Sequence, residues 1–249
     1  MKRYYKGIRI NASKNTHETV FEMIKESTDK TVVDIPSGNG AFVQRLNDQG
    51  FKNVFAVDIE NILEISHDNF VQGDMTMELP VSNNSFDILV CIEGIEHINR
   101  QVDFIREANR ILTDQGAIII TSPNISSLRS RWKWFWTGHH YRCSSPLNEN
   151  APNPLHHISM TSFSELRYML HTNGFRINEI KTNRIKPVSL LYSIFLPLVF
   201  LSTSWIYIRT GNKKGTSEIN KSVFRQVFSR EILFGETLIV KAIKTGTSI

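Results

Sequence analysis

Thr31-Val32-Val33-Asp34-Ile35-Pro36-Ser37-Gly38-Asn39-Gly40 is the stretch that decides the fold. Its β-branched first half predicts a buried strand, and its second half, rich in Pro, Ser and Gly, predicts a tight turn. Glycine allows the backbone of such a turn to adopt positive φ and to pass close to a ligand. In open parallel sheets, ligands bind outside the carboxyl ends of the strands, where the strand order reverses. The stretch therefore predicts a strand, a turn and a helix, with a ligand beside Gly38 and Gly40.

Strand and helix patterns alternate along the rest of the chain. We expect strands at 31–35, 54–58, 86–92, 116–121, 175–180 and 236–242, and helices at 17–26, 41–48, 102–112 and 161–173. Such alternation is typical of βαβ units and a parallel sheet. The predicted fold is α/β: a Rossmann-like, doubly wound sheet, mostly parallel with an antiparallel last strand. An apolar helical insertion precedes that last strand.

Two carboxylates are placed to hold a ligand at the predicted turn. Asp34 ends the first strand, and Asp58 ends the second, 20 residues after Gly38. An acidic side chain at the end of the second strand can accept hydrogen bonds from both hydroxyls of a ribose. A nicotinamide enzyme would normally have a third glycine where this chain has Val43, so that fingerprint is incomplete. The alternative for the turn alone is a tight βα connection without a ligand.

Several further motifs together resemble the Rossmann-fold methyltransferases that use S-adenosylmethionine. The matching segments are Val32–Phe42, Gly73-Asp74-Met75, Leu79-Pro80, Ser85-Phe86-Asp87, Glu96-His97, and Arg106–Asn124 with Arg110-Ile111-Leu112 and Thr121-Ser122-Pro123-Asn124. The resemblance covers roughly residues 30–182. Pro36-Ser37 departs from the more usual Gly-Cys, but both glycines of the turn are kept.

This resemblance implies a role for each matching residue in binding S-adenosylmethionine. Asp34, Gly38 and Gly40 would line the methionine part, Asp58 would bind the ribose, and Asp74 with Met75 would contact the adenine. The remaining implied contacts are Pro36, Ser37, Ile59, Ile92 and Glu93. For Asp74, a solvated carboxylate in a turn is an equal alternative.

Glu93-Gly94-Ile95-Glu96-His97 follows the expected strand at 86–92, on the side of the cofactor crevice. Two carboxylates and an imidazole at this spacing can form a general base or a divalent-metal site. The motif resembles the Glu-x-x-Glu-His metal motif of ubiquinone O-methyltransferases and of methyltransferases that modify the 3′-terminal 2′-hydroxyl of small RNAs. In the RNA group a later histidine completes the site, and here His157, with His156 beside it, stands 60 residues after His97.

Three alternatives for this motif stay open. The first is a site for a divalent metal such as Mg, made of Glu93, Glu96, His97 and His157. The second is metal-free catalysis, with Glu96 or His97 as the base. The third is a structural role, in which Glu96-His97 caps and orients a helix.

Residues 126–160 form a predicted lid that would contact the methyl acceptor. This region is dense in aromatic and cationic residues, which can stack on sugars or bases and pair with phosphates: Arg129, Arg131, Trp132, Lys133, Trp134, Phe135, Trp136, His139, His140, Tyr141 and Arg142. An amphipathic helix packed on the domain is the alternative. We divide the chain into a cofactor-binding domain at 1–182, an insertion at 183–234, and a returning last strand with its tail at 235–249.

The insertion contains 21 uncharged residues, 188–208, of which 15 are apolar. Its length alone would permit a transmembrane helix, but strands of one sheet are expected on both sides of it. Cationic residues flank both ends: Lys181, Arg184, Lys186, Arg209, Lys213 and Lys214. With Pro197 near the middle, we expect a shallow hairpin or an in-plane helix on the inner face of a membrane. A helix buried in the protein or in a dimer interface is the alternative.

Charge and cysteine content limit the compartment and the partners. Residues 1–125 hold 12 Lys/Arg against 18 Asp/Glu, whereas residues 126–249 hold 17 against 6. The basic half suggests an anionic partner such as a membrane surface, a phosphorylated substrate or RNA. The absence of an apolar core behind Met1–Lys6, and the position of Cys91 in an expected buried strand, favour a cytoplasmic location.

The acceptor is expected from a further resemblance, to methyltransferases of bacterial surface-polysaccharide synthesis. It rests on Cys91–Ile98, Arg129–Gly138 and the Phe234–Val240 ending after an apolar insertion. It implies O-methylation of a hydroxyl on a saccharide or a lipid-linked glycan. RNA 2′-O-methylation, quinone-type O-methylation and a non-catalytic cofactor-binding protein are the other hypotheses.

Overall fold

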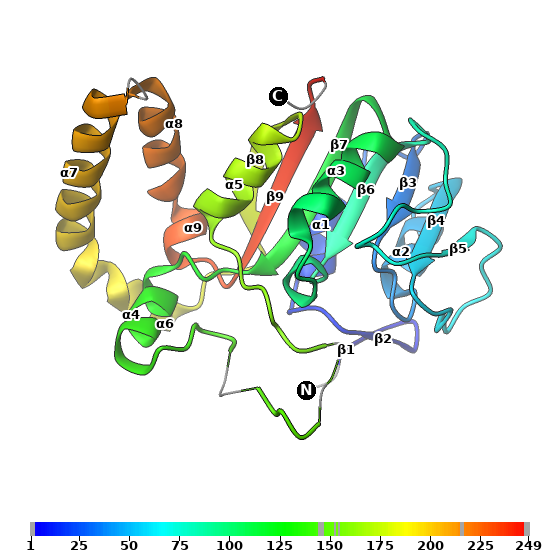
Figure 1. The fold of residues 1–249 in the computed structure, drawn as a ribbon. Helices are drawn as coiled ribbons and strands as arrows, with labels where there is room; N and C mark the ends of the chain where they lie inside the picture. The colour runs from blue at the N-terminus through cyan, green and yellow to red at the C-terminus, as the bar shows by residue number, and fades with distance from the viewer. Residues whose placement is uncertain (1–2, 144–146, 152, 154, 215–216, 247–249) are drawn as a thin grey trace.

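A seven-stranded sheet in the order β5-β4-β3-β6-β7-β9-β8 forms the centre of the computed structural model (Figure 1). The structure describes residues 3–143, 147–151, 153, 155–214 and 217–246. The strands are β3 (Thr31–Asp34), β4 (Asn53–Asp58), β5 (Phe70–Gln72), β6 (Phe86–Ile92), β7 (Leu112–Pro123), β8 (Phe175–Thr182) and β9 (Thr237–Lys244). Strands β3 to β7 pair in parallel, and β9 pairs antiparallel with both β7 and β8. The predicted doubly wound sheet with an antiparallel last strand is confirmed.

Apolar cores cover both faces of the sheet. Helices α1 (Thr16–Glu22) and α2 (Ala41–Asp48) pack on one face, where Val20, Phe42 and Leu46 are buried. On the other face lie α3 (Gln101–Ile111) and α5 (Phe163–Thr172), with Phe104 and Phe163 in the core. Burial at helical spacing on one side of each helix explains why the sequence periodicity located these elements.

The connections place the ligand crevice between β3 and β6. From β3 the chain moves outward to β4 and β5, and it then returns to the other side of β3 as β6. The strand order therefore reverses at the carboxyl ends of β3 and β6, where a crevice for a ligand opens. The short 3₁₀ turn η1 (Ile95–His97) follows β6 at this edge.

Most expected elements agree with the structure within a few residues. The largest differences are α1, which ends at Glu22 rather than residue 26, and β7, which extends over Leu112–Pro123 rather than 116–121. Strand β7 is longer because Leu112 pairs with Phe86 of β6 at one end, and Ser122 and Pro123 pair with β9 at the other. The hairpin β1 (Arg3–Tyr5) with β2 (Ile8–Ile10), and the short β5, were not expected.

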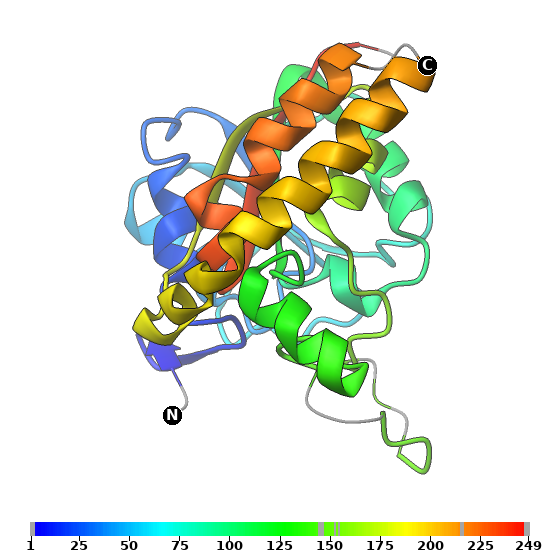
Figure 2. The ribbon, with the colours of Figure 1, turned by 90° about the vertical axis from the view of Figure 1, so that its left-hand side faces the viewer.

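The insertion is mostly helical in its described parts. It comprises α6 (Pro187–Leu190), η2 (Leu191–Phe195), α7 (Leu196–Lys214), α8 (Ser217–Val227) and α9 (Arg230–Phe234). Figures 1 and 2 show α7 and α8 running side by side in opposite directions beyond α5. The expected hairpin with its reversal at Pro197 is wrong: Pro197 is the second residue of α7, where a missing N–H costs no helical hydrogen bond. The in-plane helix, which was the other expectation, stays a prediction.

The predicted lid contains one helix in its described part, α4 (Leu128–Thr137), which ends at Gly138 in a left-handed conformation. Ser127 caps its N-terminus by accepting a hydrogen bond from the Ser130 backbone. Residues 144–146, 152 and 154 of the lid and 247–249 of the predicted tail lie outside the described residues.

Candidate functional site

The turn after β3 and the end of β4 are joined by backbone hydrogen bonds. Ser37 donates its N–H to the Val57 carbonyl at 2.9 Å, and Gly38 donates to Oδ2 of Asp58 at 2.8 Å. At Gly40, φ is 84°, and a Cβ would lie 2.9 Å from the Leu63 side chain. The positive φ therefore favours glycine at this position, and a larger residue would also displace the end of the Leu63 side chain.

A cavity of about 660 Å³ opens against this turn. It is lined by seven of the predicted cofactor residues: Asp34, Pro36, Ser37, Gly38, Asp58, Ile92 and Glu93. His97 and His157 lie on its wall as well. The structure thus gathers around one hollow residues that are distant in the sequence.

Asp34 is buried beneath the cavity, and its Oδ1 has no hydrogen-bond partner among the described residues. Burial, and then the charge of Asp58, raise the pKa of Asp34 well above the ordinary value for an aspartate. A buried carboxylate without a partner is costly unless a donor completes it. A ligand ammonium group, such as the amino end of a methionine, has the chemistry to do so.

Four predicted cofactor residues do not line the cavity. Gly40 shapes the turn, and Ile59 is exposed after β4. The Asp74 carboxylate accepts hydrogen bonds from the Thr76 N–H and hydroxyl, both at 2.8 Å, so it closes its own turn. Met75 is buried in the core beside α3. The implied adenine contacts of Asp74 and Met75 remain predictions.

Glu96, His97 and His157 come together at the cavity, with one ligand atom from each lying within 4.8 Å of the others. The two imidazole rings meet edge to face at 4.9 Å. Glu96 is fully buried, and neither of its carboxylate oxygens has a hydrogen-bond partner among the described residues. Burial, and then Glu93, raise the pKa of Glu96 well above its ordinary value. Burial, and then His97 and Arg142, lower the pKa of His157 to about 4.

Hydrogen bonds to η1 hold the segment that contains His157. The Ser159 N–H donates to the Glu96 carbonyl at 3.1 Å, and the Gln101 amide bridges the carbonyls of Ile95 and Ser159. His97 Nδ1 lies 3.1 Å from the His156 carbonyl, which can only accept, so this nitrogen is the N–H donor. The Nε2 lone pair of His97 therefore remains available to a proton or a metal ion.

Glu93 does not join this group, although it is the first residue of the predicted metal set. Its Oε1 accepts a hydrogen bond from the Ser13 N–H at 3.0 Å, and its Oε2 lies 3.9 Å from Arg142. Its φ of 46° turns the chain sharply after β6. Glu93 therefore links the N-terminal segment, the cavity and the predicted lid.

Comparisons with known proteins identify the family of the chain. A family described as "Methyltransferase domain" matches residues 9–180. The chain belongs to this methyltransferase family. The curated relatives include a probable S-adenosylmethionine-dependent methyltransferase of Mycolicibacterium smegmatis, 26% identical over 117 residues, which cover 47% of this chain and 37% of that protein. A ubiquinone biosynthesis O-methyltransferase of Rickettsia bellii is also 26% identical, over 42% of this chain and 48% of its own length. The chain thus spans less than half the length of these relatives.

Solved structures show the same methyltransferase fold. An S-adenosylmethionine-dependent methyltransferase from Archaeoglobus fulgidus has a TM-score of 0.53 at 17% identity, covering 92% of this chain and 95% of that one. One from Mesorhizobium loti has a TM-score of 0.54 at 12% identity, covering 91% and 96%. The S-adenosylmethionine-dependent methyltransferase class predicted from the motifs is confirmed.

Sequence reasoning missed several residues on the wall of this methyltransferase cavity. Arg3, Arg9 and Asn11 come from the β1–β2 region, and His17 comes from α1. Cationic residues near the N-terminus carry no spacing signal, because only the tertiary structure folds this segment back over the glycine turn. Arg142 was identified among the lid residues, but not as a neighbour of Glu93.

Proposed function

We propose that this methyltransferase transfers the methyl group of S-adenosylmethionine to a hydroxyl of a saccharide or lipid-linked glycan at the inner face of a membrane. The observation that supports O-methylation best is the pair of histidines on the cavity wall, His97 and His157, with the buried carboxylate of Glu96 beside them. A hydroxyl acceptor must lose its proton, and the two histidines line the same cavity as Asp34 and Asp58, to which we assign the cofactor.

The chemical step is an in-line displacement. The acceptor oxygen forms a bond to the methyl carbon as the carbon–sulfur bond breaks, and the sulfur leaves as a neutral thioether. The acceptor proton passes to a base, for which His97 Nε2 is the candidate because Nδ1 is held by the His156 carbonyl. Asp34 and Asp58 line the same cavity and are the residues that hold the cofactor.

The same three side chains fit a divalent metal ion. Two imidazole nitrogens and one buried, unpartnered carboxylate supply three ligands among the described residues. This donor set suits Fe²⁺ or Zn²⁺, which favour imidazole ligands, and Mn²⁺, which accepts them, better than Mg²⁺, which prefers oxygen. When bound, such an ion would lower the pKa of the acceptor hydroxyl and position it.

A membrane location is supported by what we call the apolar face. It consists of exposed side chains on α4, α6, η2 and α7: Trp132, Trp134, Phe135, Trp136, Val188, Leu190, Leu191, Ile194, Leu198, Leu201, Trp205, Ile206 and Ile208. Trp132 of α4 stacks on Phe195 of η2 with 4.5 Å between ring centroids. This contact joins the part of the apolar face on α4 to the part on α6, η2 and α7. Exposed apolar surface of this extent is typical of interaction sites, and tryptophan favours the membrane interface.

An in-plane position fits this face better than a transmembrane one. Residues Pro187–Thr210 are long and apolar enough to cross a membrane by length and composition alone, which is weak evidence for a span. However, α8 packs along α7 and also contacts α5 and α9 of the main domain. A spanning α7 would lose these contacts, whereas an α7 lying in the interface keeps them.

Quinone-type O-methylation is the second candidate, because one relative is named a ubiquinone biosynthesis O-methyltransferase. RNA 2′-O-methylation is less favoured, since Glu93, part of the motif that suggested it, pairs with Ser13 and Arg142 rather than with the histidines. A tailed quinone would also meet the apolar face, so only the methylated product separates the first two candidates.

In the deciding experiment, a methyl-labelled precursor of S-adenosylmethionine is supplied to cells that express the protein. The lipid-linked glycan, polysaccharide, quinone and RNA fractions are then separated and their label is measured. We expect label in the glycan fractions with the wild type, a loss of at least about a hundredfold with His97→Ala, and little change with the control Tyr168→Ala, which alters an exposed side chain on α5. Label confined to quinone or RNA would contradict the glycan proposal. Unlabelled fractions throughout would contradict methyl transfer altogether.

The metal proposal has a separate test. We expect purified protein to lose activity in excess chelator and to regain it with Mn²⁺, Fe²⁺ or Zn²⁺ more readily than with Mg²⁺. His157→Ala should lower metal content while leaving S-adenosylmethionine affinity unchanged. Full activity in excess chelator would exclude the metal and leave His97 as the base.

A further inference from the structure

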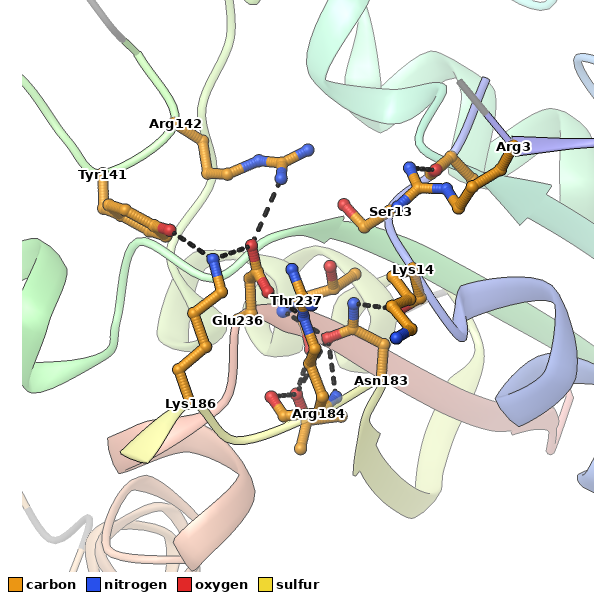
Figure 3. Close-up of polar contacts among 12 residues, drawn as sticks. Arg3, Ser13, Lys14, Tyr141, Arg142, Asn183, Arg184, Lys186, Glu236 and Thr237 are labelled. Atoms are coloured by element: carbon orange, nitrogen blue, oxygen red, sulfur yellow. Dashed lines mark hydrogen bonds and ion pairs between the residues drawn. The ribbon is translucent and has the colours of Figure 1, made fainter. Parts of the chain in front are cut away.

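Glu236, which immediately precedes β9, is the centre of a cationic cluster that the methyl-transfer site does not use. Its side chain is 3% exposed, and it receives Lys186 Nζ at 2.9 Å, Arg142 at 3.4 Å and the Arg184 guanidinium. Figure 3 shows Lys186 between this carboxylate and the Tyr141 hydroxyl, to which it donates at 2.9 Å. Burial alone would raise the pKa of Glu236, but the hydrogen bonds from Arg184 and Lys186 outweigh it and lower the pKa.

The cluster has more positive charge than Glu236 neutralises. Arg129 adds a fourth cation, since its guanidinium lies 4.0 Å from the Tyr141 ring centroid. The only second carboxylate that ion-pairs with these four cations, among the described residues, is Glu93, 3.9 Å from Arg142. A single cation is enough to neutralise a buried carboxylate. The additional positive charges of this cluster are therefore not explained by the need to neutralise Glu236.

The cations can still bind a ligand. The side chains of Arg142, Arg184 and Lys186 are each about one third exposed, at 31%, 32% and 30%. A guanidinium has five N–H donors and an ammonium has three, and the contacts in the structure use only some of them. The backbone of Arg142 adopts a left-handed φ of 82°, a strained conformation for a non-glycine residue.

The cluster lies between the two surfaces that the proposed function joins. Arg142 belongs to the cavity wall beside Glu93 and His157. Lys186 is the N-cap of α6, where the apolar face begins. The cluster therefore connects the cavity wall at Arg142 with the start of the apolar face at Lys186, and an acceptor that binds both surfaces would lie along it.

We propose that Arg142, Arg184 and Lys186 bind a phosphate or diphosphate of the acceptor, located between its saccharide and its apolar tail. Glu236 positions the three cations, and Tyr141 orients Lys186. The proposal rests on the function proposed above and narrows its substrate class. Charge-assisted N–H···O bonds from guanidinium and ammonium groups are the usual way in which proteins hold phosphate oxygens.

Inorganic pyrophosphate is the probe, because its binding can be measured without the methyl acceptor. In calorimetric titrations we expect the wild type to bind pyrophosphate, Lys186→Met to bind it at least tenfold more weakly, and Lys186→Arg to stay within a few fold of the wild type. Lys181→Met is the matched control, since Lys181 pairs with Glu179 on β8 and should bind like the wild type. Thermal unfolding of each variant shows whether it folds. The titration of the wild type tests the proposal even if a variant fails to fold.

Three outcomes would overturn the proposal. The first is a wild type without affinity for pyrophosphate. The second is a weaker affinity of Lys186→Met for S-adenosylmethionine, because this would mean that the cations bind the carboxylate of the cofactor. In the third, Lys186→Met no longer sediments with phosphatidylglycerol vesicles while its pyrophosphate affinity is unchanged, which would assign the cluster to membrane headgroups.

These results are separable from a failure of the proposed function. If pyrophosphate binding depends on Lys186 but no glycan fraction is labelled, the phosphate subsite stands and the glycan acceptor is wrong. If glycans are labelled and pyrophosphate does not bind, methyl transfer stands and the subsite is wrong.

Discussion

The Asp58 carboxylate accepts two backbone hydrogen bonds, from Gly38 at 2.8 Å and from Ile59 at 2.8 Å. One side chain therefore holds the glycine turn in place and presents its remaining lone pairs to the cavity. The spacing of the sequence predicts ribose binding at this position, and the contact with Gly38 adds a structural role.

We expect Asp58→Ala to weaken S-adenosylmethionine binding by about ten- to a hundredfold, equivalent to roughly 1.5–3 kcal/mol, because a charge-assisted hydrogen bond is lost. Calorimetry measures the affinity for S-adenosylmethionine, and Asp68→Ala, which alters an exposed aspartate, is the control. An affinity equal to that of the wild type would show that Asp58 does not contact the cofactor.

His17 predicts how stability depends on pH. It is buried against Phe42, with 5.2 Å between ring centroids, and burial, followed by Arg45 and Arg3, lowers its pKa to about 3. The unfolded chain gains a proton at His17 below about pH 6.5, whereas the folded protein does not. The contribution of His17 to the free energy of unfolding is therefore fully present above about pH 6.5. Below that pH it is lost by about 1 kcal/mol per pH unit towards about pH 4.

Chemical denaturation between about pH 4 and pH 7 tests this dependence. We expect His17→Leu to have a flatter profile than the wild type, while His139→Leu keeps the wild-type slope. Parallel profiles for wild type and His17→Leu would mean that other groups control the acid sensitivity.

Among the helices, α7 stands apart because many of its apolar residues point outward. Leu198 and Leu201 are 68% and 67% exposed, whereas α3 buries Phe104, Ile105 and Ile111. Apolar content alone does not distinguish a core helix from one that faces lipid. The packing of α8, which contacts α7 as well as α5 and α9, decides it: α8 covers one side of α7 and leaves Leu198 and Leu201 exposed.

For the double variant Leu198→Glu/Leu201→Glu we expect unfolding stability within about 0.5 kcal/mol of the wild type, because both side chains are already exposed. Co-sedimentation with vesicles should fall at least tenfold. Tyr168→Glu, on the exposed side of α5, is the control and should sediment normally. A double variant that unfolds would instead indicate that α7 packs against protein.

In the molecule as a whole, the strand order converts a charge difference along the chain into a charge difference in space. The acidic residues 1–125 supply β1 to β7 and helices α1 to α3, while the basic residues 126–249 supply β8, β9 and helices α4 to α9. Because β9 and β8 follow β7 at one edge, the basic half lies on the side of α7 (Figure 1).

We therefore expect binding to phosphatidylglycerol vesicles to weaken about tenfold as salt rises from about 0.05 to 0.5 M, because surface charge is screened over shorter distances. Binding to phosphatidylcholine vesicles should be weaker and nearly independent of salt. Sedimentation that does not change with salt on anionic vesicles would contradict an electrostatic contribution.

The sheet, the glycine turn and the family can all be predicted from the amino-acid sequence. Residues 31–58 contain a complete strand, turn, helix and strand, and the interactions that define them are local or lie between neighbouring strands. Hydrophobic periodicity and glycine positions report such interactions directly. For this reason the sequence alone assigns Asp34, Gly38 and Asp58 to one ligand site.

Which distant residues meet is settled by tertiary packing. It brings His157 to Glu96 and His97, keeps Glu93 outside that group, and gathers three cations around Glu236. These contacts depend on loops held by a few hydrogen bonds, such as those from the Ser159 N–H to the Glu96 carbonyl and from Gln101 to the Ser159 carbonyl, which leave no periodic pattern in a sequence. The orientation of α7 is hidden for a related reason: composition records how apolar a helix is, and only packing determines which of its sides is covered.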